Sequence, residues 1–311
     1  MAKYRQNLPQ LAGDIFLSDG GMETTLIFDE GAELPHFASF VLMSSPEGRQ
    51  QLKNYYIRYL EIARKHRAGF ILDTPTWRAN PDWGALLGYG PEELRTVNRD
   101  SIALLAELRN EFEPDGAPCV ISGAIGPRGD GYKAGDMDAG EAETYHAAQI
   151  ESFAQTEADM VSAYTLTNYK EAIGIARAAQ LNAMPCAISF TVETDGRLVT
   201  GLSLADAINR VDDATGASPV YYLINCAHPT HFTQALEKGE PWVDRVYGAK
   251  ANASAKSHAE LDESATLDAG DPLDLGQRYN TLRQTFPGMR VLGGCCGTDH
   301  RHIAAICEAC L

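Results

Sequence analysis

Strand-like and helix-like segments alternate along the whole chain, and this alternation restricts its fold more than any other feature. Apolar runs rich in β-branched residues predict strands at 14–19, 68–74, 118–126, 159–165, 185–191, 220–226, 245–251 and 290–295. Most runs are continuously apolar, as expected for parallel strands that are covered on both faces. Helical periodicity between and after them predicts helices at 45–66, 90–112, 139–157, 168–180, 203–211, 230–238, 272–285 and 298–310.

Eight strands that alternate with eight helices favour an α/β fold of the (β/α)8 TIM-barrel type, with residues 1–311 forming one domain. The alternative is an open doubly wound sheet, which often carries a phosphate-binding turn after its first strand. Here the first strand ends in SDGGMETT, which lacks the G-x-G-x-x-G pattern, and the glycines of 123–131 have the wrong spacing for a P-loop. The polar stretch 252–271 predicts a long loop after the seventh strand.

The overall charge and the N-terminus narrow the classes of partner. A formal net charge of −16 argues against general binding to nucleic acid or to an anionic membrane surface. The N-terminal MAKYRQNLPQ has no apolar signal core, and no run is long enough to cross a bilayer. We therefore expect a cytoplasmic protein that acts on small molecules, and a homo-oligomer remains an open option.

The cysteines give the sharpest indication of chemistry. The chain has seven of them and no export signal, so we expect reduced thiols rather than a disulfide framework. Cys226 closes the sixth strand in INCAHP, and Cys295 and Cys296 close the eighth strand in GGCCGT. In a barrel the catalytic groups lie at the C-terminal ends of the strands, so these three thiols can converge above one rim.

Three protein ligands with a free fourth position are typical of a catalytic zinc site, whereas structural zinc normally has four protein ligands. Two adjacent cysteines reach one ion only where the backbone bends sharply. The sequence therefore predicts that Gly293, Gly294 and Gly297 provide the conformational freedom for that bend.

Other roles for these cysteines remain open. Cys226 alone could be a small buried apolar residue. Cys295 and Cys296 could form a strained vicinal disulfide, which a reducing compartment disfavours. They could also join Cys307 and Cys310 in a four-cysteine structural site, although the last two lie far along the final predicted helix. Cys119 and Cys186 lie early in their strands, and we assign them to packing.

The chain resembles the homocysteine S-methyltransferase family nearly from end to end. The resemblance rests on LSDGGMETTL, ISGAIGPRG, ISFTVETDGRLVTG, INCAHP and LGGCCGTDHRHI. The combination of G-G-C-C-G-T with an upstream N-C is the most specific of these features. The resemblance implies a zinc-dependent methyltransferase of the type that includes betaine–homocysteine methyltransferase.

Several residues acquire expected roles through this resemblance. The zinc ligands carry over to Cys226, Cys295 and Cys296, which would also be the catalytic residues. Substrate contacts carry over to the strand-one segment Asp19, Gly20 and Gly21, and we add Thr76 of TPTW and Asn225 beside Cys226. His302 falls on a family histidine, but its position alone predicts a solvated residue of the first helical turn.

Two segments depart from the family pattern. The family typically has F-E-T at the end of strand four, where the glutamate holds the amino group of homocysteine, and here Tyr164 takes that position. A phenol can accept a hydrogen bond from an ammonium but carries no charge at neutral pH. The usual T-N-T-Y of strand two reads TPTW, so Pro75 replaces an amide side chain.

The expected function is zinc-dependent transfer of a methyl group from a small activated donor, such as a sulfonium or a betaine, to homocysteine, as in methionine biosynthesis. Trp77 and Trp83 are candidates for cation–π contact with that donor. One alternative keeps the zinc but uses a different thiol or a selenol, or runs as a demethylase. Another is a non-catalytic barrel that binds zinc or thiols.

Overall fold

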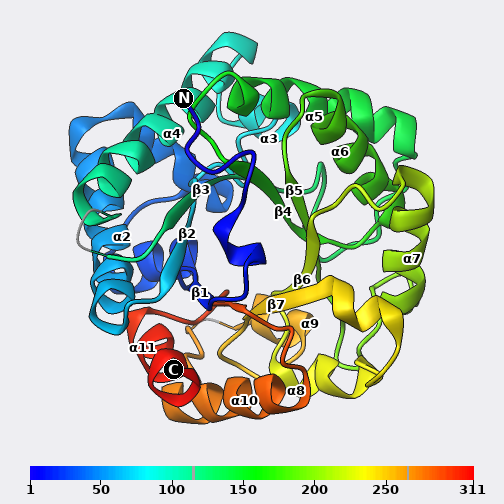
Figure 1. Cartoon of the computed structure of the whole chain (residues 1–311). Helices are drawn as coiled ribbons and strands as arrows, with labels where there is room; N and C mark the ends of the chain where they lie inside the picture. The colour runs from blue at the N-terminus through cyan, green and yellow to red at the C-terminus, as the bar shows by residue number, and fades with distance from the viewer. Residues whose placement is uncertain (114–115, 265) are drawn as a thin grey trace.

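Eight parallel strands form a closed barrel in the order β1 to β8, each strand pairing with its sequence neighbours and β8 closing onto β1. A computed structural model describes residues 1–113, 116–264 and 266–311 of the chain, and Figure 1 views it along the barrel. The strands are β1 Phe16–Leu17, β2 Gly69–Asp73, β3 Cys119–Ile125, β4 Met160–Leu166, β5 Cys186–Phe190, β6 Tyr221–Asn225, β7 Val246–Ala251 and β8 Val291–Gly294. The expected TIM barrel is confirmed.

Helices surround the barrel and follow the strands along the chain (Figure 1). The long ones are α2 Pro46–His66, α4 Pro91–Phe112, α5 Ala139–Ala154, α6 Tyr169–Leu181, α7 Leu204–Thr215, α10 Pro272–Thr285 and α11 His300–Cys310. The short ones are α1 Met22–Thr24, α3 Pro81–Leu86, α8 Pro229–Phe232 and α9 His258–Asp262. Within the described residues, no helix is both long enough and apolar enough to span a bilayer.

The two faces of the strands enter two different apolar cores, which explains why the runs are apolar without alternation. In β2, Phe70 and Leu72 join the large core beneath the helices, while Ile71 joins the smaller core inside the barrel. Tyr221 and Val291 also lie in the inner core. Burial of both faces is the condition that selects continuous apolar sequence in parallel strands.

Polar caps fix where the helices begin. Ser45 accepts a hydrogen bond from the backbone of Gly48 at the start of α2. Asp138 and Glu141 form a reciprocal capping box at the start of α5. These caps satisfy backbone N–H groups that have no partner within the helix, and they orient each helix against the sheet.

The N-terminal segment closes the end of the barrel opposite the strand C-termini. Leu8 packs into the inner core, and the buried Gln10 amide contacts the sulfur of Met160 and the hydroxyl of Tyr221. Figure 1 shows this blue segment lying across the middle of the barrel. One end is thereby filled, and a site that requires access must lie at the other.

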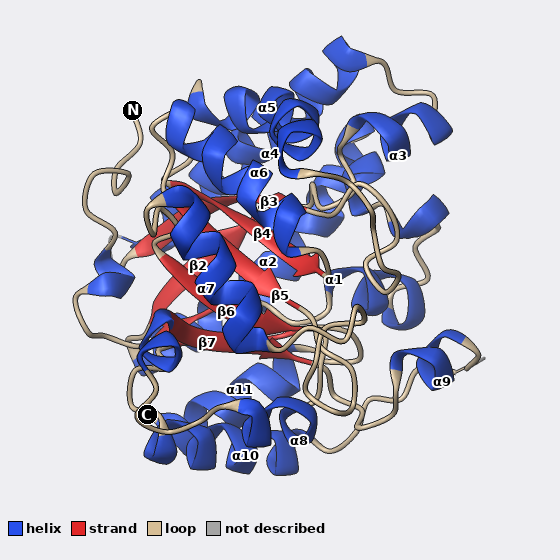
Figure 2. Ribbon diagram, turned by 90° about the vertical axis from the view of Figure 1, so that its right-hand side faces the viewer, coloured by secondary structure: helices blue, strands red, loops and turns tan. Residues whose placement is uncertain are grey.

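The structure differs from the sequence expectations in the connections. The helix expected at 230–238 is only α8 and a 3₁₀ turn at Thr233–Ala235, since Pro229 starts it and Gly239 soon follows. The expected loop 252–271 contains α9, and its residue 265 lies outside the described part of the chain. Figure 2 shows long loops, with α1 and α9, gathered beyond one end of the strands.

Candidate active site

Three thiols meet at the C-terminal rim of the barrel. Cys226 directly follows β6, and Cys295 and Cys296 directly follow β8. Their Sγ atoms all lie within 4.8 Å of one another, and they are the one group of this kind among the described residues. We call them the thiol triad. Cys226 and Cys295, whose Cα atoms are 5.4 Å apart, form a disulfide, so the expectation of reduced thiols does not hold for this pair. Cys296 is free, and the vicinal disulfide with Cys295 is not formed.

The donor set suits zinc. Zinc–thiolate bonds of about 2.3 Å in a tetrahedron place the sulfurs roughly 3.8 Å apart. The three sulfurs lie within 4.8 Å of one another, so they could reach this spacing once the Cys226–Cys295 pair is reduced. Three thiolates would leave one ligand position for a substrate. Cys307, which is buried, and Cys310 lie on α11 outside this cluster, so the geometry gives no support to a four-cysteine site.

Backbone strain and close packing shape the rim around the triad. Cys226 has a positive φ of 53°, which is costly for a residue with a Cβ, and its carbonyl accepts hydrogen bonds from Asn252 Nδ2 at 3.0 Å and His258 Nε2 at 2.5 Å. Gly297 has a φ of 79° and supplies the expected bend after the two cysteines. A Cβ on Gly294 would come within 2.0 Å of the Thr298 hydroxyl, so that glycine serves close packing.

Each sulfur of the triad has one polar neighbour from a different segment. Thr165 Oγ1 lies 3.8 Å from Cys226 Sγ, and Asn225 Nδ2 lies 4.0 Å from Cys295 Sγ. The Tyr132 hydroxyl lies 3.8 Å from Cys296 Sγ. Burial raises the pKa of Cys296, and the Tyr132 hydrogen bond opposes this shift. A bound cation would be needed to favour the thiolate there.

The expected substrate-binding residues divide into those at the rim and those engaged in packing. Asn225 contacts the triad and also binds Thr165 through its side chain. A Cβ on Gly21 would come within 2.5 Å of the Cys295 carbonyl, so the segment after β1 packs closely against the backbone of the thiol segment. The Thr76 hydroxyl instead donates to the Ala124 carbonyl at 2.8 Å, which ties the segment after β2 to β3.

Below the triad, four side chains form a buried polar group that we call the Lys250 cluster: Asp19, Asp73, Tyr164 and Lys250. Lys250 Nζ donates to Asp19 Oδ1 at 2.7 Å and to Asp73 Oδ2 at 3.1 Å. Tyr164 donates its hydroxyl proton to Asp73 Oδ2 at 2.7 Å. Sequence reasoning missed Asp73 and Lys250, although each is a lone charge at the C-terminal end of an apolar strand.

Burial and charge compete within the Lys250 cluster. Burial alone would lower the pKa of Lys250, but the charges of Asp19 and Asp73 outweigh it and hold that pKa above its usual value. Burial raises the pKa of Asp19, and the Lys250 charge offsets only part of this effect. Burial and the neighbouring Asp73 raise the pKa of Tyr164 well above its usual value, so the phenol remains protonated.

Two further expectations have specific outcomes. Trp77 and Trp83 were candidates for contact with a cationic donor, but the Arg78 guanidinium lies over both rings, 4.5 Å and 3.7 Å from their centroids. The expectation that His302 is solvated is wrong. The ring is fully buried and donates from Nε2 to the Ala269 carbonyl at 2.8 Å, which ties α11 to the loop after β7.

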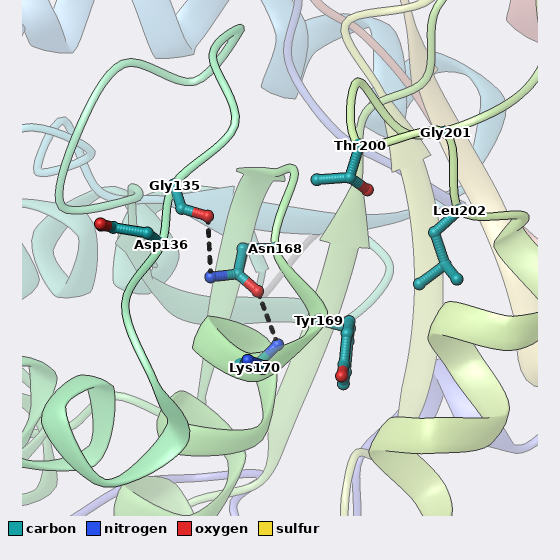
Figure 3. A pocket seen from close by; sticks show the side chains of 8 residues that line it. All are labelled: Gly135, Asp136, Asn168, Tyr169, Lys170, Thr200, Gly201 and Leu202. Carbon is teal, nitrogen blue, oxygen red and sulfur yellow. Dashed lines mark hydrogen bonds between the residues drawn. The ribbon is translucent and has the colours of Figure 1, made fainter.

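A surface pocket lies beside the rim, between the loops after β3, β4 and β5. It is lined by residues 135–136, 168–170 and 200–202, and none of the expected site residues belongs to it. Figure 3 shows Asn168 bridging the Gly135 carbonyl and the Lys170 amide, so this polar side chain is engaged in holding the loops. The pocket therefore offers no chemistry comparable to the triad.

Comparison with known proteins identifies similar chains. The family model described as Homocysteine S-methyltransferase matches residues 16–310. The curated homocysteine S-methyltransferase of Escherichia coli is 28% identical over 311 residues, covering 94% of each chain. Crystal structures of the Escherichia coli homocysteine methyltransferase MmuM share the fold at 21% identity. The metallated and oxidized forms each have a TM-score of 0.76 and cover 98% of this chain and 99% of theirs.

Proposed function

Because the chain belongs to the homocysteine S-methyltransferase family, we propose that it transfers a methyl group from a small activated donor to homocysteine, giving methionine. The observation that carries the proposal is the convergence of Cys226, Cys295 and Cys296 at the open end of the barrel. The curated relative, which matches over most of both chains, supports the same acceptor.

The thiol triad would hold a zinc ion as the cofactor. When bound, zinc lowers the pKa of a substrate thiol and keeps the resulting thiolate available as a nucleophile. The residues of the chain prepare the ligands for this role, since Thr165, Asn225 and Tyr132 each place a polar group beside one sulfur. Zinc binding requires the Cys226–Cys295 pair in its reduced form, which a reducing compartment such as the cytoplasm would maintain.

The reaction is a displacement at the methyl carbon. The homocysteine sulfur forms a bond to this carbon as the bond to the donor atom breaks, and the donor atom leaves with the electron pair. A donor whose methyl group is on a positively charged sulfur or nitrogen therefore departs as a neutral group. The barrel contributes by holding the two reactants near contact distance and by excluding water.

Arg78 bears on how the donor binds. Its guanidinium already occupies the space over Trp77 and Trp83, so those ring faces do not form an empty cage for a cationic donor. The donor would enter over the thiol triad, beside Tyr132, whose ring lies 4.4 Å from that of His258. These two rings come from the loops after β3 and β7.

A second candidate keeps the mechanism and changes the acceptor to a thiol without an α-amino group. It is favoured by one observation, which is that Lys250 already places an ammonium between Asp19 and Asp73. In this reading the chain's own cation occupies the place that a substrate ammonium would take.

The test is a methyl-transfer assay on zinc-loaded protein with homocysteine and a panel of S-methylmethionine, S-adenosylmethionine, betaine and methylfolate. Methionine should form with at least one sulfonium or betaine donor, and metal analysis should find about one zinc per chain. Full activity in metal-free protein would contradict the proposal.

A further inference from the structure

The Lys250 cluster contains one carboxylate oxygen without a partner. Asp73 Oδ1 is buried and has no hydrogen bond to any residue that the structure describes. The other oxygens are occupied: Asp73 Oδ2 by Lys250 and Tyr164, Asp19 Oδ1 by Lys250, and Asp19 Oδ2 by Tyr55 at 3.1 Å. A buried acceptor without a donor is unfavourable, so this oxygen indicates a missing ligand.

The cluster is also short of positive charge. Asp19 and Asp73 supply two carboxylates, whereas Lys250 supplies one ammonium, and the side chains of all three are at most 9% exposed. An incoming cation would balance the charges and give Asp73 Oδ1 its donor. An alkylammonium provides both the charge and the N–H groups.

The cluster lies directly beneath the thiol triad. Lys250 is paired in register with Asn225 on β6 and Gly293 on β8, and Cys226 follows immediately after Asn225. Tyr164 precedes Thr165, whose hydroxyl lies beside Cys226 Sγ. An amino acid whose sulfur is held at the triad would therefore direct its short carbon chain toward these charged groups.

We infer that Asp73 Oδ1 accepts a hydrogen bond from the α-ammonium of homocysteine, and that Tyr164 is a positioning residue that orients this carboxylate. The inference rests on the proposed function and identifies what replaces the glutamate expected at position 164. The Tyr164 hydroxyl donates its proton to Asp73 Oδ2, and this bond fixes the orientation of the carboxylate. The negative charge that pairs with the substrate ammonium is therefore supplied by Asp73 on β2 and not by a residue on β4.

Calorimetric titration of zinc-loaded protein with two thiols tests this assignment without any methyl donor. The ligands are homocysteine and 4-mercaptobutanoate, which is the same molecule without the amino group. Wild type should bind homocysteine roughly 10- to 100-fold more tightly, as expected for one charge-assisted hydrogen bond. Asp73→Asn should remove most of this preference while binding of 4-mercaptobutanoate stays within about threefold.

Tyr164→Phe keeps the ring and removes only the donor to Asp73, so it should reduce the preference roughly three- to tenfold and still fold. The matched control is Asp159→Asn. Asp159 is also buried, but it pairs with Arg109 and the Ile121 amide just before β4, at the opposite end of the barrel. The Asp159→Asn variant should leave the preference for homocysteine over 4-mercaptobutanoate unchanged.

Equal binding of the two thiols to wild type, or equal loss of both in Asp73→Asn, would overturn the inference while leaving methyl transfer intact. Tighter binding of 4-mercaptobutanoate would support the second candidate acceptor instead. Selective binding of homocysteine without methyl transfer from any donor would sustain the inference and contradict the proposed function.

Discussion

The thiol triad and the Lys250 cluster differ in how closely their residues match the family pattern. The thiol triad carries the N-C and G-G-C-C-G-T motifs unchanged, and the fold brings its three sulfurs together. The Lys250 cluster contains Tyr164, at the position where the resemblance implies a glutamate, and a lysine that bridges two carboxylates. The chain therefore keeps the sulfur ligands that its family implies, and under the inference above Asp73 would take over recognition of the amino group.

The largest expected effect comes from substitutions in the thiol triad. Cys226→Ser or Cys296→Ser should abolish zinc retention and lower kcat/KM by roughly a thousandfold or more, since the fourth position is useful only when the other three ligands hold the metal. Metal analysis and the methyl-transfer assay measure the two effects. Cys307→Ser is the matched control. This buried thiol lies outside the triad, so the variant protein should retain its zinc and its activity.

In the Lys250 cluster, the substitution Lys250→Met should act mainly on stability. It leaves Asp19 and Asp73 buried without their shared cation, and the free energy of unfolding should fall by about 3–5 kcal/mol at pH 8. Denaturant titration measures the change. Lys256→Met is the control, because Lys256 is 49% exposed in its pair with Asp268 and its loss should cost less than about 1 kcal/mol.

The pH dependence of this variant has a definite sign. In wild type the pKa of Lys250 is raised, so its stabilisation is complete below the ordinary lysine pKa and is lost only as the pH rises through the raised value. Without Lys250, nothing in the cluster offsets the burial that raises the pKa of Asp19. The deficit should therefore shrink between pH 8 and pH 5, and a constant deficit would argue against a charge effect.

The sequence was sufficient for the barrel and the triad because both depend on local patterns. Apolar runs locate the strands, and cysteines placed directly after β6 and β8 must reach the same rim once the barrel closes. The Lys250 cluster depends on contacts between residues that are far apart in the chain. Lys250 is 231 positions from Asp19 and 177 from Asp73, so no motif records their pairing.

The sequence predicts that Tyr164 departs from the family pattern, but the partner of its hydroxyl was not visible in the sequence. A phenol at position 164 reaches Asp73 on another strand, which depends on barrel curvature and side-chain length. The burial of His302 was also not visible in the sequence. Its place in the first turn of a helix suggested solvent exposure, yet the loop after β7 folds over it and buries the ring.

The smallest expected effect concerns Thr76, which sequence reasoning assigned to substrate binding. Its hydroxyl bonds the Ala124 carbonyl at 2.8 Å and lies 2.6 Å from the Thr74 hydroxyl. Thr76→Val should lower the free energy of unfolding by about 1–3 kcal/mol, because a buried carbonyl loses its donor. The KM for homocysteine should stay within roughly twofold in steady-state kinetics. A selective rise in KM would restore Thr76 to the substrate site.

X-ray absorption at the zinc edge tests the central claim most directly, because it counts the sulfur ligands with and without homocysteine. The account predicts three sulfur ligands and one lighter ligand in the zinc-loaded protein, since Cys226, Cys295 and Cys296 are the thiols that converge within the described part of the chain. Addition of homocysteine should convert this set to four sulfurs. Four sulfurs before homocysteine is added, or a spectrum that homocysteine leaves unchanged, would contradict the account.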